Sequence, residues 1–107
     1  KIAIDKAMKE AANIPFETLQ CCRKIMDLTL EVAIHGNENS VSDAGVAAEI
    51  ANAGARGAAL NVLINLNDID DKIFCEKMKT KTERLVIETD KMLVKIRNNV
   101  TRIMRNG

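Results

Sequence analysis

The residues best suited to chemistry lie in one stretch, between Asn37 and Leu66. It begins with a polar segment that includes Asp43, continues as a run of alanine and glycine, and ends with Asn61 and Asn65 in an apolar setting. A carboxylate can transfer a proton or stabilise a cationic centre, and an amide can bind the polar edge of a ligand. A helix that only fills a core does not need this order of residues, so we expect any function to be visible here.

The middle of this stretch predicts a helix that packs closely against its neighbours. Eleven of the seventeen residues from Asp43 to Ala59 are alanine or glycine. Each glycine inside a helix costs about 0.5–1 kcal/mol relative to alanine, which is tolerated where another backbone comes close. We therefore expect a central helix with neighbours on more than one face. Ser40 with Asp43 resembles a capping box, although Ser42 could be the cap instead.

Helical geometry limits what the two polar ends can do together. Asn61 follows Asp43 by eighteen residues, so the two side chains and that of Asn65 project from one face of the helix. At 1.5 Å per residue, Asp43 and Asn61 are roughly 27 Å apart. Within one chain they cannot share a small ligand. Either one end alone is a site, or an antiparallel partner helix brings the start of one helix beside the end of another.

Each of these polar residues also has a structural explanation. Asp43 would cap the helix, and the two asparagines would form interhelical hydrogen bonds, because a buried amide must be satisfied. His35 is the only imidazole and invites a general-base reading, but a histidine in the last turn of a helix is better explained by the terminal carbonyls and the helix dipole. We prefer the structural explanation for His35 and leave it open for Asp43, Asn61 and Asn65.

The composition excludes several classes of protein. The 107 residues carry 16 basic and 15 acidic side chains, with two Phe and no Trp or Tyr, so the chain offers neither a basic field nor stacking platforms for nucleic acid. No apolar run is long enough to span a membrane. Cys21, Cys22 and Cys75 form neither a Cys-x-x-Cys pair nor an even set, which favours a reducing cytoplasmic location and predicts no metal site. We expect no nucleic-acid or membrane partner.

Hydrophobic periodicity predicts an all-α protein, an antiparallel bundle of about four helices. The first helix covers residues 1–13, and Pro15 either starts a second helix or kinks a continuous one up to His35, where Gly36 is expected to end it as a left-handed cap. Its stripe should include Ile25, Leu28 and Val32. The last helix, of about 30 residues, follows the acidic segment 67–71. The chain starts inside a helical pattern, so we expect a fragment whose exposed stripes are covered by the rest of its domain or a second subunit.

Two motifs in this order resemble the formiminotransferase-cyclodeaminase family. They are Asn37-x-Asn39-Ser40-x-Ser42-Asp43-Ala44-Gly45-Val46-Ala47-Ala48 and Gly57-Ala58-x-x-Asn61-Val62-x-Ile64-Asn65-Leu66. The similarity runs from Ala7 at least to Asp71 and corresponds to the C-terminal half of the cyclodeaminase domain, so residues 1–107 are expected to be that half. The family also contains stand-alone methenyltetrahydrofolate cyclohydrolases.

The resemblance implies a helical, homodimeric folate enzyme. It would either cyclise 5-formiminotetrahydrofolate with release of ammonia or interconvert methenyl- and 10-formyltetrahydrofolate, with the folate as substrate and no prosthetic group. The family's Pro-Gly-Gly-Gly-Ser turn and its usual catalytic acid are absent from this chain, so the catalytic residues remain unassigned and Asp43 is only a candidate. The resemblance places half of a folate pocket at Asn39, Ser42 and Asp43 first, and at Asn61 and Asn65 second. The alternative is a non-catalytic helical assembly module.

Overall fold

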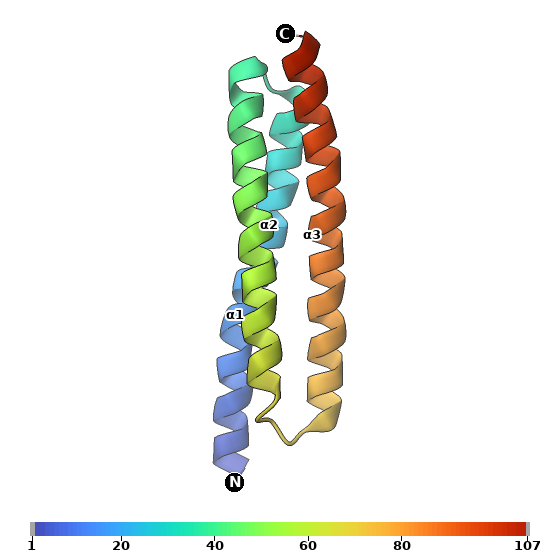
Figure 1. The fold of residues 1–107 in the computed structure, drawn as a ribbon. Helices are drawn as coiled ribbons and strands as arrows, with labels where there is room; N and C mark the ends of the chain where they lie inside the picture. The colour runs from blue at the N-terminus through green and yellow to red at the C-terminus, as the bar shows by residue number, and fades with distance from the viewer. Residues whose placement is uncertain (1, 107) are drawn as a thin grey trace.

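The protein is a bundle of three long helices that run up, down and up (Figure 1). The computed structural model describes residues 2–106, and within them α1 covers Ile2–His35, α2 covers Glu38–Leu66 and α3 covers Lys72–Asn106. The bundle is a rod of 60 × 17 × 16 Å, and the C-terminal end of α3 lies beside the turn between α1 and α2. The all-helical prediction is confirmed, and the expected count of four helices is wrong.

Three helices are found instead of four because Pro15 lies inside α1 and does not end it. Proline removes one backbone hydrogen bond and costs about 3 kcal/mol within a helix. Packing on both sides of the proline offsets this cost, because Ala12 and Leu19 are fully buried. The continuous form that the sequence left open is therefore the observed one.

The turn between α1 and α2 differs from the expected caps. Asn37 is the N-cap of α2, with Oδ1 accepting a hydrogen bond of 3.0 Å from the backbone N–H of Ser40, so the helix begins before both Ser40 and Ser42. Gly36 is not a left-handed cap, because no described residue has a positive φ. It is required for space instead: a Cβ there would lie 2.5 Å from the Val32 carbonyl oxygen.

The core is formed by three clusters along the rod. Met26, Ala48 and Ile96 lie in the cluster near the α1–α2 turn, Leu19 and Ala55 lie in the middle one, and Ala12, Val62 and Met78 lie near the α2–α3 loop. Each cluster takes residues from all three helices, if partly buried neighbours such as Leu85 are included. The small residues of α2 allow this close approach on its inner side, but within residues 2–106 the opposite side of α2 lacks the expected neighbours.

Two apolar seams run along opposite faces of α2. The inner seam is buried and consists of Ala44, Ala48, Ala51, Ala55, Ala58 and Val62. The outer seam consists of Val46, Ile50, Ala53, Gly57, Leu60 and Ile64, each two positions after an inner-seam residue and therefore about 200° around the helix. The outer seam is exposed, with Ile50 and Leu60 both 68% accessible. On α1, Ile25, Leu28 and Val32 are likewise exposed, as expected of apolar stripes that a chain of this size cannot cover alone.

Candidate functional site

The first polar group lies in the first turns of α2 and is open to solvent. Asn39 and Asp43 are exposed, and Ser42 is half-buried. The Ser42 hydroxyl donates a hydrogen bond of 3.1 Å to the carbonyl oxygen of Asn39. Asp43 forms no ion pair or side-chain hydrogen bond with the other residues of the described chain, 2–106, because the capping role belongs to Asn37. Its exposed carboxylate is therefore unpaired within residues 2–106.

The second polar group lies at the far end of the same helix. Asn61 is exposed, Asn65 is half-buried, and neither side chain forms a hydrogen bond within residues 2–106. The interhelical hydrogen bonds that would explain both asparagines structurally are thus not formed inside this chain. Because α2 is one uninterrupted helix from Glu38 to Leu66, the separation of roughly 27 Å from Asp43 holds. The structure does not bring the two polar groups together.

Ser42 lines a cleft of about 350 Å³ between the start of α2 and the end of α3. The cleft wall is mainly apolar, with Val46, Val100 and Met104, and the ion pair of Glu49 with Arg97 is its charged part. Both bonds of this pair, from Arg97 Nε and from one terminal nitrogen, are 2.6 Å long. The hydrogen bond from Arg97 lowers the pKa of Glu49, which favours the ionised carboxylate. Both carboxylate oxygens are bound by Arg97. Asp43 does not line this cleft.

A polar network in the middle of α2 was missed by sequence reasoning. The amide of Asn52 is buried and donates hydrogen bonds to Thr89 Oγ1 at 3.4 Å and to Asp90 Oδ1 at 2.8 Å, while Arg56 binds the other oxygen of Asp90 at 2.7 Å. Asn52 lies among the alanines on the inner side of α2, and a polar residue in that position could have indicated a buried hydrogen bond. Its partners on α3 could not be read from the spacing. The network joins α2 to α3 and uses the amide nitrogen of Asn52 for two hydrogen bonds.

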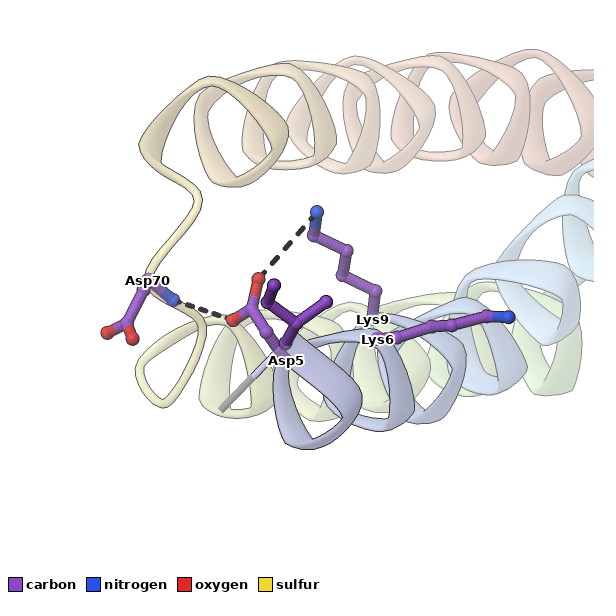
Figure 2. Close-up of a pocket in the computed structure, with 5 residues that line it drawn as sticks. Asp5, Lys6, Lys9 and Asp70 are labelled. Carbon is purple, nitrogen blue, oxygen red and sulfur yellow. Dashed lines mark hydrogen bonds and ion pairs between the residues drawn. The ribbon is translucent and has the colours of Figure 1, made fainter.

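A cluster of charged side chains lies at the end of the rod where α1 begins and the α2–α3 loop turns (Figure 2). Lys9 donates a hydrogen bond of 2.7 Å to Asp71 and forms an ion pair of 3.7 Å with Asp5. The other oxygen of Asp5 accepts the backbone N–H of Asp70 at 3.0 Å, and Figure 2 shows both contacts of Asp5. The Lys9 ammonium also lies 5.3 Å from the ring centre of Phe74. Asp71 caps α3 through the backbone N–H of Phe74, which confirms the expected acidic helix start. These groups fasten α1 to the α2–α3 loop, and we call them the end clamp.

The remaining reactive side chains do not form a catalytic set. His35 is 73% exposed at the end of α1, lies 3.6 Å from Glu31 and does not line the cleft described above. Cys21, Cys22 and Cys75 are free thiols, and burial raises the pKa of Cys22 and of Cys75. Within residues 2–106, no three His, Cys, Asp or Glu side chains are placed to hold a metal ion, and no helix is long and apolar enough to cross a membrane.

The chain is similar to proteins of one known family. The family model described as formiminotransferase-cyclodeaminase matches residues 1–84. A methenyltetrahydrofolate cyclohydrolase of Methylorubrum extorquens is 44% identical over 85 residues, which are 79% of this chain and 41% of that protein. A formimidoyltransferase-cyclodeaminase of Dictyostelium discoideum is 36% identical over 89% of this chain and 18% of its own length. The same-named protein of Rattus norvegicus is 33% identical over 80% of this chain and 16% of its own length.

These matches can be placed on the three helices and on the length of the relatives. The chain spans less than half the length of each of these relatives. The family match covers α1, α2 and the first part of α3, and it includes both polar groups of α2. The recognition made from the two motifs is thereby confirmed. The chain belongs to the formiminotransferase-cyclodeaminase family.

Proposed function

We propose that the protein carrying this chain is a folate one-carbon enzyme. Its substrate would be a one-carbon derivative of tetrahydrofolate, and its reaction either methenyltetrahydrofolate hydrolysis or cyclisation of the formimino form with loss of ammonia. The observation that carries this proposal is 44% identity, over 79% of the chain, to a protein named as a methenyltetrahydrofolate cyclohydrolase. The family match over residues 1–84 supports the same substrate class.

The α2 residues would contribute part of the folate pocket. Asn39, Ser42 and Asp43 are accessible, and the Asp43 carboxylate has no competing partner among residues 2–106. Both reactions pass through a cationic methenyl carbon and need proton transfers at nitrogen, and an accessible carboxylate can stabilise that cation or move a proton. Asn61 and Asn65 have unused amide groups that can bind the pterin edge or the glutamate carboxylates.

A calorimetric titration tests folate binding. The full-length protein is titrated with 5-formyltetrahydrofolate, which carries the one-carbon unit but is not turned over by loss of ammonia. Saturable heat is expected, and it should weaken in the Asn61→Ala variant while Asn13→Ala, an exposed asparagine of α1, behaves as wild type. Absence of heat from the wild-type protein would instead favour the assembly-module alternative.

A pair of assays separates the two reactions. Decay of the methenyl absorbance measures the hydrolase, and ammonia release from the formimino substrate measures the deaminase. The higher identity to the cyclohydrolase leads us to expect the first activity, and the relatives named formimidoyltransferase-cyclodeaminase make the second the specific alternative. A cytoplasmic location is proposed from three free thiols, and a homodimer from the exposed apolar surface.

A further inference from the structure

A cavity of about 390 Å³ lies between the second half of α2 and the first half of α3. Its walls are apolar and consist of Leu60, Leu63, Val86 and Ile87. Arg56 also lines it and comes seven residues before Leu63, so the cavity extends for roughly 10 Å along α2. Small-molecule sites have this size and combine apolar walls with a few polar groups that orient the ligand.

One polar group of the cavity lining is a hydroxyl without a partner. Thr82 is fully buried, and its Oγ1 is the one buried side-chain nitrogen or oxygen in residues 2–106 that forms no hydrogen bond. The other buried threonines, Thr29 and Thr89, each donate to a backbone carbonyl oxygen of their own helix. An unpaired buried hydroxyl destabilises a folded protein. A ligand atom in the adjoining cavity would satisfy it.

The next residue of α3 adds an unpaired charge. Glu83 lines the cavity, and its exposed carboxylate forms no ion pair or side-chain hydrogen bond within residues 2–106. The other charged residue of the lining, Arg56, is bound to Asp90 at 2.7 Å. The unpaired polar groups of the cavity are therefore a carboxylate, which only accepts hydrogen bonds, and a hydroxyl, which both donates and accepts.

These two groups specify the edge of a ligand. The two oxygens of one carboxylate can bind two N–H groups that lie side by side in a plane. A 2-amino-4-oxopyrimidine ring has such an edge, because its amino group is next to a ring N–H, and its carbonyl oxygen, next along the edge, can accept from the Thr82 hydroxyl. The flat faces of the ring suit a cavity whose walls are aliphatic.

We propose that this cavity is a ligand site for a fused 2-amino-4-oxopyrimidine ring, as found in pterins and in guanine. The Glu83 carboxylate accepts hydrogen bonds from the amino group and the ring N–H, and the Thr82 hydroxyl donates to the ring carbonyl oxygen. The aliphatic side chains of α2 and α3 cover the two faces of the ring. The site follows from the cavity and its unpaired groups, so it does not rest on the proposed function.

The cavity is separate from both polar groups of α2. Asn61 and Asn65 project about 200° around the helix from the cavity, because each comes two residues after a lining residue. Asp43 comes thirteen residues before Arg56, the nearest lining residue of α2, and therefore lies roughly 20 Å away along the helix axis. A ring bound in the cavity does not contact these residues of the same chain.

A calorimetric titration of the full-length protein tests the site. Pterin and guanosine are the two probes, and the one that gives saturable heat identifies the source of the ring. Glu83→Gln should weaken this binding at least tenfold, because an amide has one accepting oxygen in place of two. Glu76→Gln, likewise exposed and two turns earlier on α3, should bind as the wild type does. No saturable heat with either probe, or equal binding by the Glu83 variant, overturns the proposal.

The Thr82→Val variant tests the hydroxyl separately. Valine has nearly the same shape, so the unfolding midpoint of the ligand-free protein should stay the same or rise, while the affinity for the probe falls about threefold or more. Thr89→Val is the stability control, and its midpoint should fall, because that hydroxyl donates to the Val86 carbonyl oxygen. A lower midpoint for Thr82→Val would mean that its hydroxyl is already paired, which overturns the proposal, as would an unchanged affinity.

Failure of the folate proposal gives a different result. A wild-type protein that binds guanosine through Glu83 but binds no 5-formyltetrahydrofolate keeps this site and loses the proposed function. A protein that binds 5-formyltetrahydrofolate equally well with and without the Glu83 carboxylate, and binds neither probe, keeps the proposed function and loses this site.

Discussion

Asn52 in the centre of α2 donates a hydrogen bond of 2.8 Å to Asp90 on α3, and Arg56 binds the other oxygen of the same carboxylate. A buried amide that satisfies a carboxylate on a neighbouring helix fixes the register of the two helices, because sliding either one leaves both groups unpaired. This contact therefore sets the height at which α2 presents its polar ends relative to α3.

Replacing Asn52 by alanine should destabilise the bundle. The change removes two hydrogen bonds and leaves the buried Thr89 and the half-buried Asp90 partly unsatisfied, which costs about 1–3 kcal/mol. Urea unfolding followed by circular dichroism measures the loss. Asn61→Ala is the matched control, because that exposed amide forms no bond within residues 2–106 and its removal should change the free energy of unfolding by less than about 0.5 kcal/mol. Equal midpoints for the two variants would contradict the role of Asn52.

Replacing Gly36 by alanine should also destabilise the protein. The new methyl group would meet the Val32 carbonyl oxygen at 2.5 Å and Ser40 Oγ at 2.6 Å, so the turn between α1 and α2 must shift. Overpacking of this kind costs about 1–3 kcal/mol. Gly45→Ala is the control, since a Cβ there would lie 3.4 Å from Val100, an ordinary contact distance, and alanine favours the helix. Thermal unfolding should give a lower midpoint for the first variant only.

The end clamp should make stability fall at acid pH. The hydrogen bond from Lys9 lowers the pKa of Asp71 from its ordinary value of 3.8, so the folded state holds the ionised carboxylate more strongly than the unfolded state does. Its contribution is present above pH 3.8 and is lost as the pH falls through the lowered value. Thermal melts between neutral pH and about pH 2 should show this dependence.

Asp71→Asn should flatten that acid dependence, because the amide cannot titrate. Asp68→Asn is a suitable control, as Asp68 lies exposed in the same loop. An unchanged pH profile in the Asp71 variant would show that the clamp does not contribute to stability.

The proposed function predicts that replacing Asp43 by asparagine in the full-length protein lowers turnover by about 10²-fold or more, the usual loss when a proton-transfer group is removed. The fold should persist, because Asp43 is exposed and Asn37 caps the helix. Initial rates with the methenyl and formimino substrates measure the effect, and Asp68→Asn again provides the control. Turnover close to wild type would remove Asp43 from the site.

The periodicity of the sequence predicted the helices well because their buried stripes are regular. Met78, Thr82, Thr89 and Ile96 are all buried on α3, as their spacing indicates. Pro15 was undecidable from local preference, since its cost is outweighed by the packing of Ala12 and Leu19. The cap at Asn37 competed with Ser40 and Ser42, which have similar capping preferences.

The candidate site was predictable only as a set of positions on one helix. Period and rise gave the distance between Asp43 and Asn61, and the uninterrupted helix agrees with it. The partners of Asn52 depend on which residues of α3 lie at the same height, and the sequence of one helix contains no such information. The same holds for the end clamp, in which Lys9 and Asp71 are 62 positions apart.

The end clamp also suggests the order in which the bundle folds. Hairpins of helices adjacent in the chain close short loops, and helical bundles rich in such local contacts fold within microseconds to milliseconds. The bonds from Asp5 and Lys9 to the α2–α3 loop instead join residues 62–65 positions apart, so like the Arg23–Glu88 bond they close long loops. We therefore expect them to form after the transition state, where they slow unfolding more than they speed folding.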